Sequence, residues 1–201
     1  MNAQLDKILC ARYPTLLLAN TRHNDDQFFF ECGSGWFEVI NATLAVINKR
    51  STTNNLGVTV DQVKEKFGAL RIYCAQADDY ITTAAEIAEQ ISELICEICG
   101  NEGSIITVKG WNLTRCEVHR LTTASDPAAA TMVSSEYSAN LAEAIESILS
   151  LFSSNPRWAL EWLKKSAFIF GHNKPYEMLQ TCEGCKVLIS FIGKLEHGVL
   201  P

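Results

Sequence analysis

The chain has 201 residues, of which 47% are hydrophobic and 20% are charged, and its formal net charge is −6 at pH 7. This is the composition of a globular protein with enough apolar residues for one large core or two small ones, and it excludes a disordered chain. An acidic chain without a local basic cluster is not expected to bind nucleic acid, because neutralised phosphates supply most of that affinity.

The cellular compartment is predicted from the first residues, MNAQLDKILCARYP, which include an acid and lack the basic start and long apolar core of a signal peptide. No apolar run reaches about 18 residues, the length that a membrane helix needs. We therefore expect a cytoplasmic protein with no membrane partner. In such a compartment, eight cysteines favour metal binding over disulfides. Isolated Cys10, Cys32 and Cys74 are expected to be small buried side chains.

The first part of the chain has both helical and strand patterns. Apolar residues at helical spacing predict an amphipathic helix over about 36–49, entered through a turn at 33–35. The β-rich runs 58–60 and 70–73 predict two paired strands. A long helix is predicted over 79–96, with Cys96 at its end.

A composition break separates this part from the rest. The segment 122–135 is rich in small and polar residues and has no periodicity, which is typical of a linker. It predicts two domains, 1–121 and 136–201. The expected fold is α+β: a mixed α/β N-terminal domain with a zinc-ribbon-like knuckle, followed by an all-helical C-terminal domain.

The C-terminal part has only helical patterns. A helix is predicted over 136–152, and Asn155-Pro156 supplies an N-cap type and a first-position proline for a helix that carries Trp158 and Trp162. After a loop, Pro175 opens a short helix. Thr181 is the predicted N-cap of the last helix, which should end at Gly198.

Two pairs of metal-binding residues form the most specific motif. Cys96-x2-Cys99 and Cys116-x2-His119 each have the gap that lets two ligands reach one ion, and the β-branched stretch between the pairs suits a hairpin. Zinc takes four tetrahedral thiolate or imidazole ligands, so four protein ligands would leave no open position for a catalytic water. We therefore predict a structural zinc site. The alternative is a set of buried core cysteines with a surface histidine.

A second dithiol, Cys182-x2-Cys185, lies in the first turn of the last predicted helix and has no nearby partner pair. It is either structural or a redox or half-metal site. The remaining histidines, His23, His172 and His197, are isolated, which is typical of polar or partly buried residues without a metal role.

The last 45 or so residues contain a series of motifs: a Trp-bearing helix, a Gly-containing loop, Pro175-Tyr176-Glu177-Met178-Leu179, Thr181-Cys182-Glu183-Gly184 and Leu195-Glu196-His197-Gly198-Val199. In this order the motifs resemble the C-terminal toxin-binding domain of Xre/MbcA/ParS-type antitoxins. The resemblance implies a helical domain that binds a toxin. It implies a RES-domain toxin, which destroys cellular NAD, as the partner. It also implies a partner-binding set made of Trp162, Lys194, Glu196, His197, Gly198, Val199 and Leu200.

The first domain contains the motifs Tyr13-Pro14, Glu31-Cys32-Gly33-x-Gly35-Trp36-Phe37, Val63-Lys64-Glu65-Lys66-Phe67-Gly68-x-Leu70-Arg71, and the segment from Cys96 through Gly110-Trp111 to His119. With these motifs it resembles an uncharacterised zinc-containing family of bacterial and phage genomes. Antitoxins of the first family normally begin with a helix-turn-helix that binds operator DNA. Because this chain departs from that pattern, we do not expect operator binding.

These observations favour a binding protein over an enzyme. The chain has no Gly-rich phosphate loop, no nucleophile elbow and no clustered acid pair. The expected function is that of an antitoxin-like protein, of phage or prophage type, which neutralises a RES-type toxin and is a possible homodimer. The alternative is a zinc-stabilised interaction or assembly module with no toxin partner.

Overall fold

A computed structural model describes residues 1–17, 28–122 and 135–199 and has the predicted α+β fold. Its α-helices are α1 (Ala3–Arg12), α2 (Pro14–Leu17), α3 (Phe37–Thr53), α4 (Asp79–Ser92), α5 (Ser135–Leu151), α6 (Trp158–Leu163), α7 (Pro175–Met178) and α8 (Cys182–Glu196). Its strands are β1 (Phe30–Glu31), β2 (Thr59–Lys66), β3 (Ala69–Ala75), β4 (Ser104–Val108) and β5 (Trp111–Arg115). Short 3-10 turns are η2 (Ser34–Trp36), η3 (Glu117–His119) and η4 (Phe168–Phe170).

A three-stranded sheet in the order β1-β2-β3 forms one side of the molecule. The predicted pairing of these two strands is confirmed: β2 and β3 pair antiparallel, and both are longer than the β-rich runs alone indicate. They join at Phe67 and Gly68, whose φ angles of 58° and 84° are those of a tight hairpin turn that matches the twist of the strands. Strand β1, which pairs in parallel with β2, was not predicted because two residues carry no periodicity.

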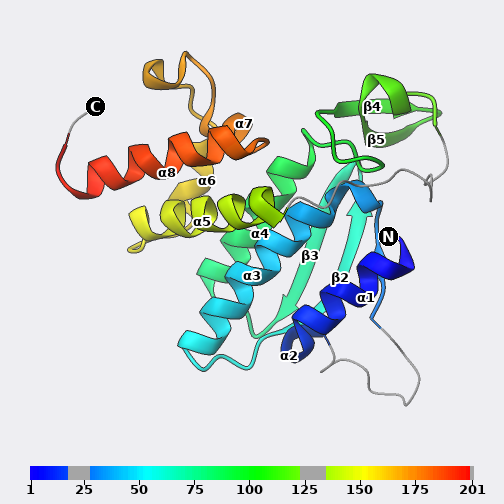
Figure 1. Cartoon of the computed structure of the whole chain (residues 1–201), viewed down its shortest axis with the longest axis horizontal. Helices are drawn as coiled ribbons and strands as arrows, with labels where there is room; N and C mark the ends of the chain where they lie inside the picture. Colours follow the sequence, from blue (N-terminus) through cyan, green and yellow to red (C-terminus); the bar gives the residue numbers. More distant parts are fainter. Residues whose placement is uncertain (18–27, 123–134, 200–201) are drawn as a thin grey trace.

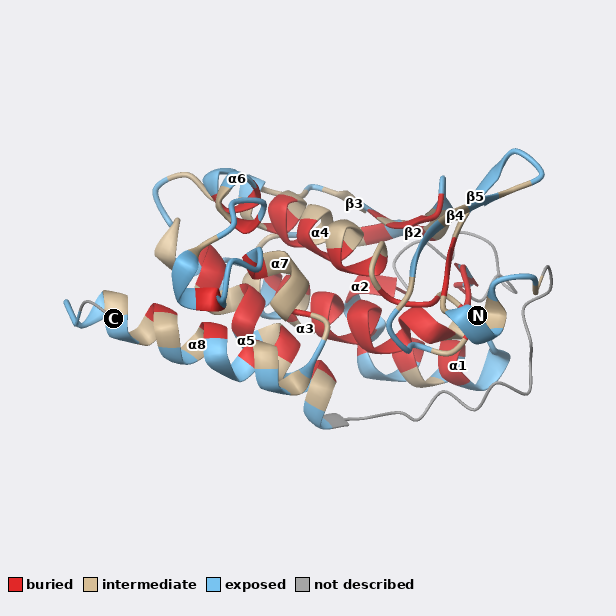
Figure 2. Ribbon diagram, turned by 90° about the horizontal axis from the view of Figure 1, so that it is seen from above, coloured by how far each residue is buried: buried red, intermediate tan, exposed pale blue. Residues whose placement is uncertain are grey.

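Helix α4 packs against β3 of the sheet and against α3. Figure 2 shows the sheet on one side, α4 and α3 below it, and α5 with α8 on the far side. Helix α3 begins as predicted and runs four residues further, to Thr53. Helix α4 was predicted to reach Cys96 but ends at Ser92, because the following residues leave the helix to form the turn of the metal site.

The helical part of the chain shares its core with the first part. Helix α5 packs on α3, and α8 packs on α5 (Figure 1). Buried apolar side chains from both parts form one cluster, and Asn41 on α3 donates a hydrogen bond to Ser138 on α5. The regions predicted as domains 1–121 and 136–201 are therefore in direct contact. Most of the predicted linker, residues 123–134, lies outside the described residues.

The boundaries of the C-terminal helices follow local capping. The Thr181 hydroxyl accepts a hydrogen bond from the Gly184 amide at 3.1 Å, which confirms the predicted N-cap of α8, and Pro175 opens α7 as predicted. Helix α6 begins at Trp158 with Arg157 as its N-cap, so the predicted N-cap at Asn155 and first-position proline at Pro156 are wrong. These two residues instead form a turn, in which Trp158 N donates to Asn155 O at 3.1 Å. No helix in the described ranges is both long and apolar enough to span a bilayer.

Candidate metal centre

The four predicted ligands come together at one end of the molecule, next to the β4–β5 hairpin that projects in Figure 1. Their ligand atoms, three Sγ atoms and the Nδ1 atom of His119, all lie within 4.8 Å of one another. Cys96 is buried and the other three residues are half-buried. The site can therefore hold a metal ion, as the spacing of the two pairs predicted.

The separations fit a tetrahedral ion. Cys99 Sγ and Cys116 Sγ are 3.8 Å apart, and His119 Nδ1 is 3.7 Å from Cys96 Sγ and 3.2 Å from Cys116 Sγ. Bonds of about 2.3 Å to sulfur and about 2.0 Å to nitrogen at tetrahedral angles place sulfurs about 3.8 Å apart and sulfur and nitrogen about 3.5 Å apart. These three separations are close to those values, and all four atoms lie within 4.8 Å of one another, so the group can hold one metal ion.

Two turns shape the ligand pairs. After α4 ends, the Cys96 amide donates to Asn101 O at 2.7 Å and the Gly100 amide donates to Cys96 O at 2.9 Å, which folds residues 96–101 into a knuckle. The backbone amides of Asn101 and His119 donate to the sulfurs of Cys99 and Cys116. In the second pair, η3 brings His119 back toward Cys116, as the predicted hairpin requires.

The segment that leads into α3 packs directly on this knuckle. Gly35 N donates to Glu97 O at 2.7 Å, and the indole Nε1 of Trp36 donates to Ile95 O at 2.8 Å. A Cβ atom on Gly35 would lie 2.1 Å from Cys96 O, so only glycine allows this approach. The Gly-x-Gly-Trp motif therefore joins the knuckle to the core.

A nearly buried ion pair lies between the two ligand pairs. Arg115 Nη1 donates to Glu97 Oε2 at 2.6 Å, and the side chains of Arg115 and Glu97 are only 6% and 12% exposed. The other carboxylate oxygen accepts from Gly33 N at 3.1 Å, and Glu97 N donates to Thr114 O. Glu97 thus connects the α3 entry, the knuckle and β5, while Arg115 directly precedes the ligand Cys116.

The Phe67-Gly68 turn reaches the same region. Thr114 donates its hydroxyl proton to Gly68 O, and Leu70 N donates to Ser92 Oγ at 2.8 Å. All three longer motifs of the first domain therefore meet at the metal centre, where they supply ligands or backbone support.

Protonation of the thiols is set by burial and by hydrogen bonds. Desolvation raises the pKa of Cys99 to about 12, and nearby Cys96 adds to this rise. At Cys116, desolvation acts in the same direction, but hydrogen bonds from the backbone and ring of His119 outweigh it and lower the pKa to about 7. Because a metal binds thiolates, loading the site releases protons and is favoured as the pH rises.

The second dithiol has a different environment. Cys185 is buried and donates to Leu179 O, while Cys182 is half-buried and accepts from Asn140 Nδ2 at 3.6 Å. Burial raises the pKa of Cys185 to about 12, so it stays a thiol at neutral pH. Within the described ranges, the Cys96 group is the one cluster that brings at least three metal-ligating residues together. These observations favour a structural role for Cys182 and Cys185.

The remaining cysteines and histidines have ordinary environments. Cys10 and Cys32 are buried as predicted, and Cys74 is half-buried. His172 is exposed and stacks edge-on against Phe168, and exposed His197 contacts Gly193 O on its own helix. His23 lies outside the described residues.

The predicted partner-binding residues lie on two elements. Lys194, Glu196, His197, Gly198 and Val199 are exposed at the end of α8. Trp162 on α6 is instead half-buried, with its ring 5.9 Å from that of Phe152. It therefore contributes to packing between α5 and α6. Leu200 lies outside the described residues.

No family model, curated protein or solved structure matches this chain. The motifs and the geometry of the site therefore carry the functional argument.

Sequence reasoning missed the supporting residues of the metal site. Glu97 and Arg115 are charged residues next to ligands, and nothing in their spacing predicts that they meet. The signal that could have identified Glu97 and Arg115 is that each lies next to a predicted ligand in the sequence. Charged residues beside metal ligands often orient those ligands.

Proposed function

We propose that this protein is a zinc-stabilised, antitoxin-like module that binds and neutralises a RES-type NAD-degrading toxin through its C-terminal helical part. The observation that carries the proposal is the exposed end of α8, where the residues implied by the antitoxin resemblance gather. The metal centre lies on the opposite part of the fold and serves as scaffold.

Zinc is favoured by the donor set. Three thiolates and one imidazole at tetrahedral spacing suit zinc, whereas magnesium and calcium prefer oxygen ligands. With four protein ligands the ion has no open position, so its contribution is to stability.

The end of α8 supports a binding role through its exposure. Val199 N donates to Lys194 O at 2.9 Å, which closes the last turn and directs Val199 away from the core. The Val199 side chain is 54% exposed, beside exposed Glu196 and His197. An apolar side chain held on a capped helix end can insert into a partner's cleft, and such central residues concentrate binding energy.

Co-expression with RES-domain toxins tests the proposal. The full chain is expected to restore cellular NAD and growth, and a chain that lacks residues 196–201 is expected to do neither. Circular dichroism and zinc content of the truncated chain should match those of the full chain, because the removed residues lie beyond the core. Equal protection by both chains, or protection by neither, would contradict the proposal.

An assembly module without a toxin partner is the second candidate, and the β4–β5 hairpin favours it. The cross-strand pairs Val108–Trp111 and Ile106–Leu113 place four apolar side chains on one face, and Trp111 is 75% exposed. Exposed apolar patches often mark interaction sites. If Trp111→Ser abolishes partner recovery from the native host and Val199→Asp does not, this second function is correct.

A further inference from the structure

A groove of about 420 Å³ runs along α8 on the side that faces η4. Its walls come from α8 and from the turn after Ala167. The lining residues are Ile169, Phe170, Glu183, Lys186, Val187, Ser190, Phe191 and Lys194. The groove is concave, so it can receive side chains from a partner.

The groove has an apolar floor. Phe170 is buried and its ring meets that of Phe191 edge-on, with centroids 4.9 Å apart. Val187 is 40% exposed and Ile169 is 44% exposed, so apolar surface remains open to solvent along the groove. In the same turn as Ile169 and Phe170, Phe168 is 84% exposed.

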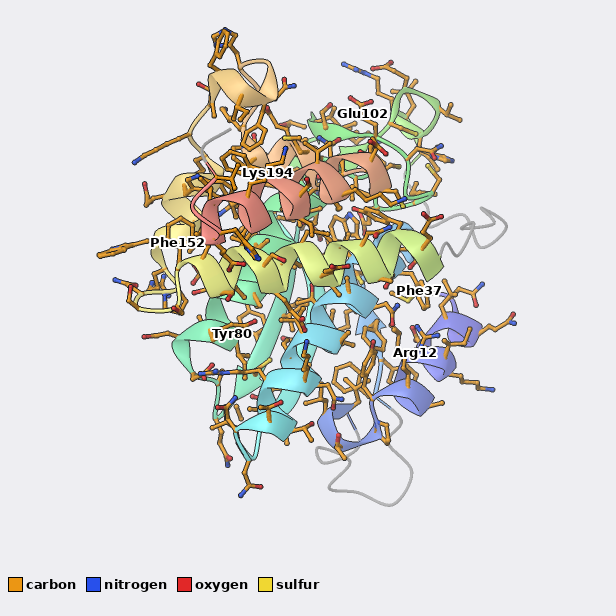
Figure 3. All side chains as sticks on the ribbon, turned by 60° about the vertical axis from the view of Figure 1, so that its left-hand side comes forward. Arg12, Phe37, Tyr80, Glu102, Phe152 and Lys194 are labelled. Carbon is orange, nitrogen blue, oxygen red and sulfur yellow. The ribbon has the colours of Figure 1, made fainter. Side chains whose placement is uncertain are left out.

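One lysine lies near each end of the apolar floor of the groove. Lys186, Ser190 and Lys194 follow one another at intervals of four residues on one face of α8, so the two lysines are about 12 Å apart along the helix. Figure 3 shows Lys194 on α8, on the side of the projecting loop. Lys186 pairs with exposed Glu136 at 2.8 Å, and Glu183 lies one turn before it. The Lys194 end is therefore the more positive one.

The charge of this region differs in sign from that of the whole chain. Residues 157–201 contain six Lys or Arg and four Glu, so their formal charge is 6 − 4 = +2, whereas the whole chain carries −6. The loop 164–174 contributes Lys164, Lys165 and Lys174 and has no acidic residue. A partner surface of negative charge is complementary to this region.

We propose that this groove binds an acidic amphipathic helix of the partner protein. Apolar side chains of that helix would fill the floor over Val187 and Phe191, and its carboxylates would lie beside Lys194 and, two turns away, Lys186. A second copy of this chain fits less well, because it would bring lysines against lysines. A flat bilayer would leave the concave floor empty. That the partner is the toxin rests on the proposed function. That the groove suits an acidic helix does not depend on the proposed function.

Isotope-edited NMR of the full chain with synthetic peptides tests this inference. The probe is a helical peptide of about 18 residues with a leucine stripe and glutamates two turns apart, and its matched control carries lysines in place of the glutamates. We expect the acidic peptide to shift the amides of Val187, Ser190 and Phe191 and to bind at least about tenfold more tightly than the basic peptide. Lys194→Glu should reverse this preference, and Val187→Asp should weaken both peptides.

A matched control is Lys7→Glu, which makes the same charge change at an exposed position on α1 and should leave the preference unchanged. Equal binding of the two peptides, no binding, or shifts confined to other elements would overturn the inference. Self-association that Val187→Asp abolishes would assign the groove to a second copy. Binding to phosphatidylcholine vesicles with about one-third phosphatidylserine that Phe168→Ser abolishes would assign the region to a membrane. If the chain binds the acidic peptide but neutralises no toxin, the proposed function is wrong, whereas the groove is still a site for an acidic helix.

Discussion

The indole of Trp36 donates a hydrogen bond to the carbonyl oxygen of Ile95, 2.8 Å away and one residue before the ligand Cys96. Trp36 is fully buried at the entry of α3, so this bond joins the metal knuckle to the main core. The metal site is therefore expected to influence the order of the adjoining core as well as that of its own turn.

Metal removal is the first test of this arrangement. We expect about one zinc ion per chain, and we expect Cys99→Ser to lose it and to lower the melting temperature. Structural zinc contributes on the order of 10 kcal/mol of binding energy, which is comparable with the stability of a whole domain. Hydrogen exchange should accelerate over residues 94–121 and at 34–36, and much less in α5 and α8. Cys74→Ser, a change outside the site, should keep zinc; an unaltered melting curve for Cys99→Ser would refute the structural role.

Glycine at position 35 is expected to be indispensable. In Gly35→Ala the new Cβ atom would meet Cys96 O at 2.1 Å, and the backbone must shift, at a cost of about 3 kcal/mol. The matched control is Gly193→Ala on α8, where no heavy atom lies within 4 Å of the new Cβ. That change should stabilise the protein by about 0.5 to 1 kcal/mol. Urea unfolding measures both, and similar values for the two variants would contradict the packing described.

The Glu97–Arg115 pair is expected to matter through the cost of leaving one charge alone. Arg115→Met should destabilise the protein by about 3 to 5 kcal/mol because it leaves a nearly buried carboxylate without its cation. Adding Glu97→Gln should recover part of that loss. Arg120→Met breaks the exposed Glu117–Arg120 pair and should cost less than about 1 kcal/mol. If the effects of Arg115→Met and Glu97→Gln on stability are additive in a double-mutant cycle, the two side chains are not coupled.

Asp6 on α1 gives a prediction about pH. Burial raises the pKa of its carboxyl above the ordinary value of 3.8, although the amino terminus and a hydrogen bond from the Phe30 amide oppose the rise. A raised carboxyl pKa in the folded state favours folding only while the group is protonated. The stability of the natural chain relative to Asp6→Asn should therefore be highest below pH 3.8 and fall as the pH rises through the raised pKa. Thermal unfolding from acid to neutral pH measures the difference; a constant or rising difference would show that burial does not control this group.

The sequence by itself determined the features that depend on neighbouring residues. The two ligand pairs, the β4–β5 hairpin between them, the Thr181 N-cap and the helix of α5 were all predicted, because ligand spacing, hydrophobic periodicity and capping act within a few residues. The N-terminal motif with Gly35 and Trp36 was noticed in the sequence, but its contact with the knuckle at residues 95–97 was not predicted.

Only the tertiary structure decided what depends on segments far apart in the chain. It ended α4 at Ser92, because the knuckle takes the residues that follow, and it placed Glu97 against Arg115 and Gly33. It also packed α5 onto α3, so that the two predicted domains share one core, and it formed the groove between α8 and η4. Contacts of this kind are fixed by the burial of apolar surface between elements, which has no local periodicity to reveal it.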